Sequence, residues 1–414
     1  MKRSELTHLR LINIKKGQPK GYYNFDNQES FKNQKSMTDA PRLQKRRGLQ
    51  NHSLLHQILD TSLTGLSILL ALIIISSGCK KILDEFPFPP HLQNANFKQT
   101  NLVADTAGFN AMRIDTTLVN AWGIAINPTG IFWISANNAG LSEVYDHNGL
   151  ALRPPVAVPF QGMLHGGNPT GVVFNGTTDF KIVPTNNLPA KFIFATENGT
   201  ITAWNAGDST ITVVDRSAMG AVYKGIELAN DGMANYLFAT DFHNARIDVF
   251  DKNFHLVTSK PFIDSKIPMG FAPFNIRLID NKLFVTYAKQ MAPDNHDDQK
   301  GPGNGFVDIF GLDGSFLVRF ASMGVLNSPW GIADAPEGFG LGKNLILVGN
   351  FGDGRISIYG ENGKLLAQLK DGNKPITIEG LWTITFKTDE PDKLFFTAGP
   401  DDESHGLFGY LKKH

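Results

Sequence analysis

Six stretches of the chain share one pattern of hydrophobic and polar positions. Each stretch has an apolar run, a tight turn, a second apolar run, a polar loop and a third apolar run. Short apolar runs bounded by Gly, Asn and Asp are typical of β-strands, and long segments with helical periodicity are scarce. The equivalent positions are spaced 48, 54, 50, 56 and 52 residues apart, and they are Trp122, Thr170, Lys224, Phe274, Trp330 and Trp382.

A repeat of about 50 residues with three or four strands predicts a β-propeller. In the first five units a fourth apolar run follows the third, for example STITVVD and SFLVRFA, but the sixth unit has none. Residues 97–105, FKQTNLVAD, belong to no repeat. We expect them to supply the missing edge strand and to close the ring, because an open sheet edge promotes aggregation. The predicted fold is an all-β, six-bladed β-propeller over residues 97–413.

An apolar run without charge or proline spans residues 63–75. It is shorter than the roughly 20 residues of a membrane-spanning helix and has the length of a signal-peptide core. The basic triplet KRR (45–47) precedes it, and SSGC, which ends at Cys79, follows it. This pattern resembles a bacterial lipoprotein signal, in which the cysteine is lipidated, although Ser76 stands where Leu is usual. An ordinary signal peptide with an incidental cysteine is the alternative, and Cys79, the only cysteine, has no disulfide partner in the chain.

These signals divide the chain into a basic extension with a signal peptide (1–78), a Pro-rich tether (79–96) and the propeller (97–413). We expect a lipid on Cys79 to anchor the protein to the outer membrane of the bacterial cell envelope, on its periplasmic or surface side.

The charges are unevenly distributed along the chain. Of the 39 basic residues 12 lie in 1–78, and of the 39 acidic residues 5 lie there, so the remainder has 27 basic and 34 acidic residues. This mildly acidic body argues against nucleic acid as a partner.

Several blade motifs resemble those of known propellers. WGIA…FWISANN, ARIDVF and GRISIYG resemble NHL-type blades. From QTNLVAD through LVNAWGIA onward, the sequence resembles a family of uncharacterised exported bacterial NHL-like propellers, some of which end in a PEP-CTERM tail that this sequence does not show. The resemblance covers nearly all of 97–413. It implies the fold but no particular activity, because propellers host many unrelated functions.

Propeller geometry brings the links between units, and the loops that join second to third strands, to one face around the central channel. Imidazole, carboxylate and amide groups lie in these loops and suit a polar ligand or a divalent cation such as Ca²⁺ or Zn²⁺. The alternative is that these side chains are solvated or cap turns. The candidate ligand-binding residues are Asn137, His165, Glu197, Asp241, His243, Asn350 and His405, and His296 lies on the same face.

The most distinctive insertion is APDNHDDQKGPGNG, residues 292–305. Asp294, Asp297 and Asp298 offer hard oxygen ligands for Ca²⁺, although their spacing matches no defined calcium loop. No HExxH, GxSxG or phosphate-binding loop occurs in the sequence. We expect the tryptophans at repeat-equivalent positions to pack between neighbouring blades.

Two functions compete. The first is a binding module that presents the channel face to a protein, a glycan or a small molecule. The second is a metal-dependent hydrolase or lyase that resembles gluconolactonases, in which a channel cation would polarise a carbonyl and activate water. Its candidates are Asn137, Glu197, Asp241, His243 and Asn350, with one carboxylate as general base. Convergence of at least three of these five side chains on one point in the channel would favour the enzyme, whereas side chains that splay into solvent would argue against it.

Overall fold

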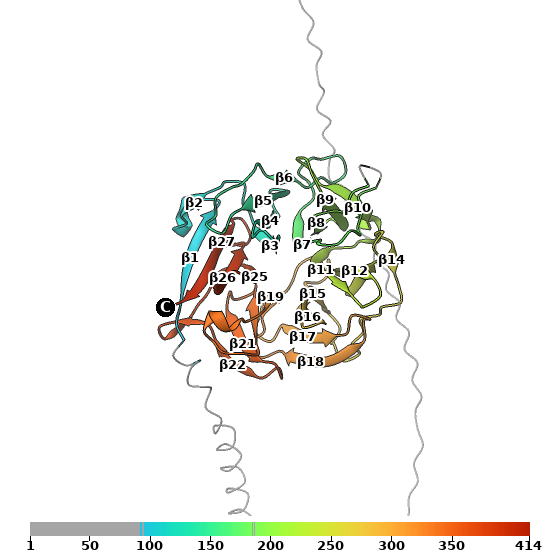
Figure 1. Ribbon diagram of the computed structural model, residues 1–414. Helices are drawn as coiled ribbons and strands as arrows, with labels where there is room; N and C mark the ends of the chain where they lie inside the picture. Colours follow the sequence, from blue (N-terminus) through green and yellow to red (C-terminus); the bar gives the residue numbers. More distant parts are fainter. Residues whose placement is uncertain (1–91, 93–94, 184, 186) are drawn as a thin grey trace, which may run out of the picture. The chain divides into compact units, whose positions relative to one another are not determined.

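The computed structural model describes residue 92, residues 95–183, residue 185 and residues 187–414. The predicted signal peptide, the lipidation site Cys79 and nearly all of the tether lie outside the described residues. The described chain is almost entirely β-structure, and six sheets surround a common axis (Figure 1). Within this part of the chain, no helix is both long and apolar enough to cross a membrane.

Blades 1 to 3 each have four antiparallel strands in chain order from the axis outward. Blade 1 contains β3 (Ala121–Ile126), β4 (Phe132–Ala136), β5 (Leu141–Tyr145) and β6 (Val156–Ala157). Blade 2 contains β7 (Pro169–Phe174), β8 (Phe192–Thr196), β9 (Thr200–Trp204) and β10 (Ile211–Asp215). Blade 3 contains β11 (Tyr223–Asn230), β12 (Asn235–Asp241), β13 (Arg246–Phe250) and β14 (Leu256–Val257).

Blades 4 to 6 complete the ring. Blade 4 contains β15 (Phe271–Ile279), β16 (Lys282–Lys289), β17 (Gly305–Phe310) and β18 (Phe316–Ser322), and blade 5 contains β19 (Pro329–Asp334), β20 (Leu345–Asn350), β21 (Ile356–Gly360) and β22 (Leu365–Gln368). Blade 6 contains β25 (Leu381–Lys387), β26 (Glu390–Ala398), β27 (Leu407–Lys413) and β1 (Phe97–Ala104), with β2 (Arg113–Ile114) beside β1. The remaining elements are the hairpin β23 (Lys370–Asp371) and β24 (Lys374–Pro375) and three short 3₁₀ helices, η1 (Ala107–Phe109), η2 (Ser217–Met219) and η3 (Glu337–Phe339).

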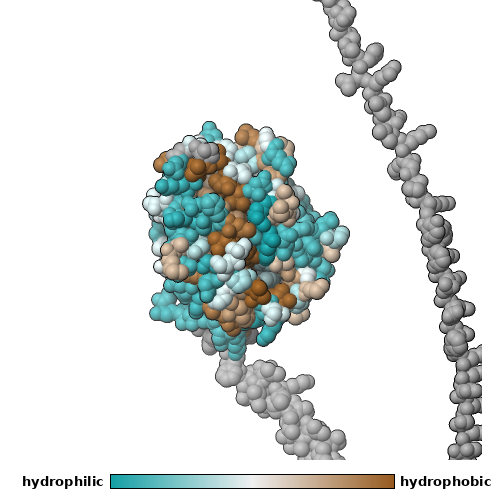
Figure 2. Space-filling view, turned by 90° about the vertical axis from the view of Figure 1, so that its right-hand side faces the viewer, coloured by the Kyte–Doolittle hydropathy of each residue, from teal (hydrophilic) through white to brown (hydrophobic). Residues whose placement is uncertain are grey.

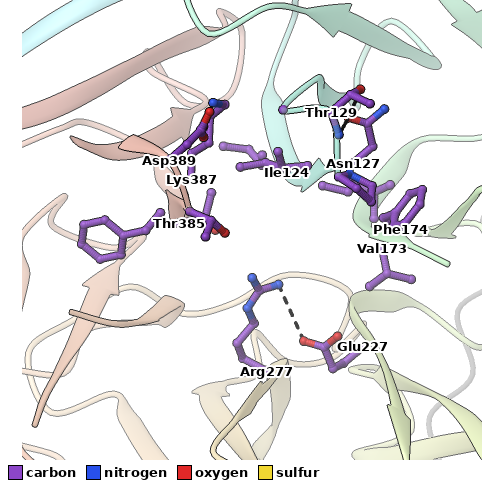
Figure 3. A pocket seen from close by; sticks show the side chains of 17 residues that line it. Ile124, Asn127, Thr129, Val173, Phe174, Glu227, Arg277, Thr385, Lys387 and Asp389 are labelled. Carbon is purple, nitrogen blue, oxygen red and sulfur yellow. Dashed lines mark hydrogen bonds and ion pairs between the residues drawn. The ribbon is translucent and has the colours of Figure 1, made fainter. Parts of the chain in front are cut away.

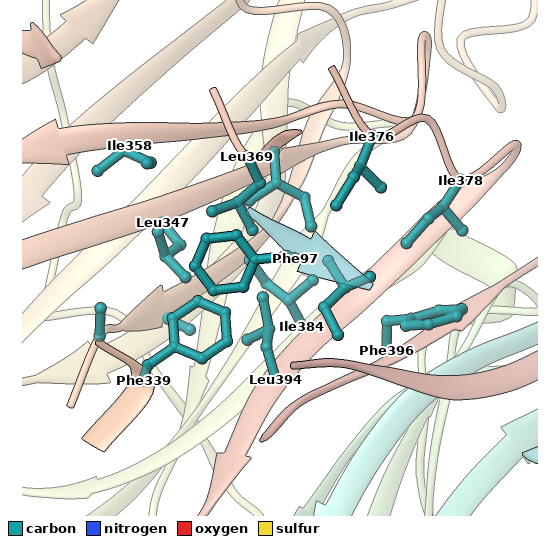
Figure 4. Packing of buried hydrophobic residues seen from close by; sticks show 14 of the residues in the cluster. Phe97, Phe339, Leu347, Ile358, Leu369, Ile376, Ile378, Ile384, Leu394 and Phe396 are labelled. Carbon is teal, nitrogen blue, oxygen red and sulfur yellow. The ribbon is translucent and has the colours of Figure 1, made fainter. Parts of the chain in front are cut away.

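The N-terminal strand closes the ring, as predicted. β1 pairs antiparallel with β27, so that Phe97 lies opposite Lys413 and Ala104 lies opposite Leu407. The Phe97 side chain is fully buried and stacks on Phe339 of η3, with ring centroids 4.6 Å apart. These two rings belong to an apolar cluster that joins blade 6 to blade 5 (Figure 4). The predicted six-bladed fold is therefore confirmed.

Each neighbouring pair of blades shares one apolar cluster, so the ring holds six such clusters among the described residues. The outer strands are less buried. Figure 2 shows the side of the ring that is on the right in Figure 1, where apolar residues form a strip between hydrophilic zones. Exposed apolar side chains of the outer strands β10, β14 and β18 are Ile211, Leu256, Phe316, Leu317 and Val318.

The inner strands approach one another closely near the axis. In all six blades, the pairing of the inner strand with the second strand is interrupted at the repeat-equivalent residue, for example at Trp122 in blade 1. A Cβ atom on Gly123 would lie 2.3 Å from the carbonyl oxygen of Thr170 on the next inner strand, so only glycine fits there.

The ring has two faces. We call the side with the inter-blade links and the loops between second and third strands the upper face, and we call the opposite side the lower face.

Candidate functional site

Two sets of equivalent residues meet on the axis at the upper face. In every blade, the amide of the residue after the second strand donates to the carbonyl just before the inner strand, over 2.8–3.1 Å. This bond holds the two sets at one height. The first set, near the start of each inner strand, is Trp122, Thr170, Lys224, Phe274, Trp330 and Trp382, and the second set is Asn137, Glu197, Phe242, Gln290, Phe351 and Gly399.

The aromatic members of both sets form one buried layer across the axis. Trp382 stacks between Trp122 and Phe351, with centroid distances of 3.6 and 3.9 Å, and Trp330 meets both tryptophans edge-on. Trp382 of blade 6 thus contacts Trp122 of blade 1 and Trp330 of blade 5, so the tryptophans pack between neighbouring blades, as expected, and they do so on the axis. This layer closes the channel below the upper face.

Lys224 is the only charged member of the first set, and its side chain is 3% exposed. Its Nζ lies 2.5 Å from Glu197 Oε1 and 3.6 Å from Asp297 Oδ1, and 5.1 Å from the centre of the Trp122 ring. Burial opposes the charge of this ammonium, but the carboxylates of Glu197 and Asp297 outweigh burial and raise the pKa of Lys224. The centre of the upper face therefore holds a buried, protonated amine.

A chain of amides links two carboxyl groups around this amine. Asn137 Nδ2 donates to Glu197 Oε2 over 3.0 Å, Asn120 Nδ2 donates to Glu403 Oε2 over 2.7 Å, and Trp382 Nε1 fixes Asn120 through its Oδ1. Burial, together with repulsion from Glu197, raises the pKa of Glu403 to about 7, although Lys224 acts in the opposite direction. Glu403 consequently changes charge near neutral pH.

The insertion supplies the outer wall of this cluster. His296 Nδ1 lies 3.0 Å from Asp297 Oδ1. This contact is the main reason why the pKa of Asp297 is lowered to about 2 and the pKa of His296 is raised. Asp298 is buried, and burial raises its pKa. The backbone carbonyl of Asp294 lies 2.9 Å from His243 Nδ1, so blade 3 holds the insertion in place.

One group of three His, Asp or Glu side chains within the described chain brings its ligand atoms within 4.8 Å of one another, and it consists of Glu197, His296 and Asp297. Of the predicted metal ligands, Asp297 belongs to this group, and Asp294 and Asp298 do not. Lys224 Nζ contacts two of the three members, so it already supplies the positive charge that a metal ion would bring, and it would repel one. The donor set does not fit a divalent cation while Lys224 is protonated.

The structure brings only some of the predicted residues together. Asn137 and Glu197 join the cluster, but Asp241 and Asn350 are the last residues of their strands and precede the axis-facing Phe242 and Phe351 by one position. Because successive strand residues point to opposite sides, both are directed away from the axis. Asp241 accepts from the Val222 amide, and Asn350 donates to the Val325 carbonyl, as loop caps do.

The predicted histidines are dispersed. His165 is exposed on the link between blades 1 and 2. His405 Nδ1 lies 2.8 Å from Asp105 Oδ2 and ties the last loop of blade 6 to the end of β1. Of the five enzyme candidates, only Asn137 and Glu197 therefore meet.

Sequence reasoning missed Lys224, Glu403 and Asn120. A signal for Lys224 was present, since a lysine stands where four of the six repeats have an aromatic residue. No comparable signal marks Glu403, because its partner Asn120 is 283 residues away in the sequence.

Exposed methionines lie on loops of the same upper face. They lie on the four successive links from blade 1 to blade 5 and on the insertion of blade 4, and their exposed fractions range from 50% to 101%: Met163, Met219, Met269, Met291 and Met323. Methionine is flexible and polarisable and adapts to varied partners, so exposed methionines are frequent on interaction surfaces.

A cavity of about 660 Å³ opens at the lower end of the channel, on the face opposite the cluster. We call it the lower funnel, and it is lined by residues of the inner strands β3, β7, β11, β15 and β25 and by the turns at 127–130 and 388–389. Figure 3 shows Arg277 and Glu227 on one side of it and Lys387 and Asp389 on another. A smaller cavity of about 20 Å³ shares Ile124, Val172 and Arg277 with it and reaches Trp330 of the aromatic layer.

Two relatives cover most of this chain. L690, an uncharacterised protein of Acanthamoeba polyphaga mimivirus, is 33% identical over 340 residues, which is 79% of this chain and 88% of L690. R648 of the same virus, also uncharacterised, is 32% identical over 340 residues, or 79% of this chain and 83% of R648. No family model matches the sequence.

Solved propellers resemble the chain more distantly. A protein of unknown function from Bacteroides thetaiotaomicron has a TM-score of 0.49 at 9% identity and covers 77% of each chain. A putative gluconolactonase has a TM-score of 0.48 at 14% identity, over 79% of this chain and 94% of its own. A streptogramin B lyase has a TM-score of 0.46 at 13% identity, over 78% and 99%. At these values the likeness indicates neither substrate nor site.

Proposed function

This chain belongs to the protein family that includes the mimivirus proteins L690 and R648, and we propose that it is a binding module whose upper face holds a polypeptide partner. The observation that carries this proposal is the combination of an acidic centre with exposed methionines on the same face. Three carboxyl groups, those of Glu197, Asp297 and Glu403, surround the single ammonium of Lys224.

The chemistry of the partner follows from these groups. Three carboxyl groups outnumber the one ammonium, and Lys224 repels a single positive charge half as strongly as a divalent cation. The centre therefore favours a monovalent cationic group, such as a Lys or Arg side chain or an N-terminal amine. The methionines offer adaptable apolar contacts to side chains that flank this group. A polypeptide supplies both features together more readily than a glycan does.

We further propose that a lipid on Cys79 anchors the module to a bacterial outer membrane. β1 begins at the lower face beside the C-terminus, since Phe97 pairs with Lys413 and the His414 amide donates to the Asn96 carbonyl over 3.1 Å. The predicted tether, residues 79–96, directly precedes β1 in the sequence.

Photocrosslinking in cells that make the protein tests the binding function. A photoreactive amino acid replaces Met163 or Met291 on the upper face, or Met233, which is 90% exposed in the β11–β12 turn on the lower face. We expect the two upper-face variants to give an adduct with the same partner, because both positions lie on loops of the upper face. The Met233 variant is the matched control and is expected to give no such adduct.

Substitution of the acidic centre links the adduct to the cluster. Glu197→Gln and Asp297→Asn together remove two negative charges, and we expect them to reduce the yield of the adduct at Met163 at least tenfold. Equal yields with and without these substitutions, or equal yields at Met163 and Met233, would show that the upper face is not the binding surface.

A further inference from the structure

The lower funnel is large enough for a small molecule. Its volume of about 660 Å³ lies within the range of roughly 300–1,000 Å³ that is usual for small-molecule sites. Above it lies a small cavity of about 20 Å³, which is lined in part by Trp330 of the buried aromatic layer. A ligand would enter by the lower face, where the funnel opens.

Arg277 on β15 has unused hydrogen-bonding capacity in this funnel. Its side chain is 39% exposed, and its one ionic contact is between Nη1 and Glu227 Oε2, at 3.6 Å. This distance is too long for a hydrogen bond. Figure 3 shows the guanidinium directed into the space between the labelled side chains. The Arg277 side chain donates no hydrogen bond to any described residue, so most of its five N–H donors are available to a ligand.

Glu227 does not depend on Arg277. Its Oε1 accepts from the Leu228 amide over 2.9 Å, and its Oε2 accepts from the Leu278 amide over 3.0 Å. Both oxygens keep these partners when the guanidinium turns toward a ligand. The ion pair therefore orients Arg277 without consuming its donors.

Lys387, the second cation of the funnel, is already paired with carboxylates at closer distances than Arg277 is. Its side chain is 9% exposed and pairs with Asp389, and its Nζ lies 3.3 Å from Glu390 Oε1. Gly130 in the opposite turn leaves room for it, because a Cβ at Gly130 would lie 2.5 Å from Lys387 Cε. Lys387 thus forms part of the wall, and Arg277 is the cation that remains free to bind.

The remaining lining is mixed, with polar side chains such as Asn127 and Thr129 beside apolar ones. Apolar side chains from three inner strands, Ile124, Val172 and Phe386, line the funnel. Thr385 also lines it, and its hydroxyl makes no hydrogen bond within the described part of the chain. A guanidinium fork, a nearby free hydroxyl and apolar walls together match a carboxylate joined to a small apolar group.

We propose that the lower funnel binds a small organic monocarboxylate, with Arg277 as its bidentate anchor and Thr385 as an additional donor. This site is separate from the upper-face function, because the aromatic layer lies between them.

Calorimetric titration of the full-length chain with benzoate, and with benzamide as its neutral counterpart, tests the site at constant ionic strength. We expect saturable binding of benzoate and none of benzamide. Arg277→Gln should weaken benzoate at least tenfold, as the loss of a charge-assisted hydrogen bond does. Arg277→Lys should give an intermediate value, because it keeps the charge and loses the fork. Arg355→Gln, which removes a half-exposed arginine of the upper-face loop in blade 5, is the matched control and should bind benzoate as the unaltered chain does.

A second measurement needs no variant. Benzoate should protect Arg277 from modification by phenylglyoxal, as read by peptide mass spectrometry, and should leave the modification of Arg355 unchanged. The proposal is overturned if benzoate does not bind saturably, if Arg277→Gln folds and binds benzoate equally well, or if benzoate protects both arginines to the same extent.

Discussion

Replacement of Lys224 by methionine removes the buried ammonium and keeps most of the volume of the side chain. Glu197 is then left with a carboxylate that is 14% exposed and has lost its 2.5 Å partner. Removal of one member of a buried ion pair costs about 3–5 kcal/mol, and because Glu197 and Asp297 retain some access to water we expect a loss of about 3 kcal/mol. This is a large part of the roughly 5–15 kcal/mol that usually separates folded from unfolded proteins.

Urea unfolding at pH 7.5, followed by tryptophan fluorescence, measures this loss. Trp122, Trp330 and Trp382 lie in the layer next to Lys224, so their emission reports on this part of the ring. The double variant Lys224→Met/Glu197→Gln should recover most of the stability, because the neutral amide can still accept from Asn137 and needs no cation. If Lys224→Met unfolds at the same urea concentration as the unaltered chain, or if the double variant is no more stable than the single one, the pairing does not stabilise the ring.

The pH dependence of this effect has a defined sign. A lysine whose pKa is raised on folding contributes its full stabilisation below its unfolded pKa and loses it as the pH rises through the folded pKa. The difference between the unaltered chain and Lys224→Met should therefore be large at neutral pH and shrink only above about pH 10.

Lys224→Met also tests the fit of a cation. Without the ammonium, Glu197, His296 and Asp297 are free to act as ligands. We expect Ca²⁺ or Zn²⁺ to raise the melting temperature of Lys224→Met and to leave that of the unaltered chain unchanged. A ligand at 100 times its dissociation constant stabilises by about 2.7 kcal/mol, which thermal unfolding detects easily. A clear shift in the unaltered chain would contradict the role given to Lys224.

Three further predictions concern other parts of the chain. Glu403→Gln should remove a decline in stability between about pH 4.5 and pH 7, because the unfolded chain releases the proton of Glu403 at the lower pH and the folded chain holds it until about pH 7. The effect on the free energy of unfolding is at most about 3 kcal/mol. The exposed neighbour Asp402 provides the control, and Asp402→Asn should leave the pH profile of urea unfolding unchanged. Phe97→Ala should destabilise the ring by about 3–5 kcal/mol, since it leaves a cavity next to the Phe339 ring. Phe316→Ala, on the outer strand β18, should cost well under half as much. Similar midpoints of urea unfolding for the two variants would argue against closure of the ring by β1. Cys79→Ala should move the protein from the detergent phase to the aqueous phase in a phase-partitioning assay, and unchanged partitioning would refute the lipid anchor.

Much of the fold follows from local sequence. The apolar runs with turn residues between them are short-range signals, and their repetition near 50 residues leaves few architectures other than a propeller. The unpaired edge of the last unit predicted the role of β1, because hydrogen bonds that a sheet leaves open have to be satisfied by some other segment.

The upper-face cluster could be predicted only in part. Asn137 and Glu197 directly follow the last residues of their strands, whereas Asp241 and Asn350 are themselves the last residues of β12 and β20. Because side chains alternate along a strand, Asp241 and Asn350 point in the opposite direction. The sequence pattern alone does not show at which residue each second strand ends, because the hydrogen bond to the neighbouring strand decides it.

The sequence by itself determined the number of blades, their strand order and the strand that closes the ring, because these depend on periodicity and on local turn chemistry. Only the tertiary structure decided which side chains meet on the axis. Glu403 reaches Asn120 across 283 residues, and the carboxylate of Glu227 reaches the guanidinium of Arg277 from the neighbouring blade. The packing of neighbouring blades brings these groups together, and burial raises the pKa of Glu403.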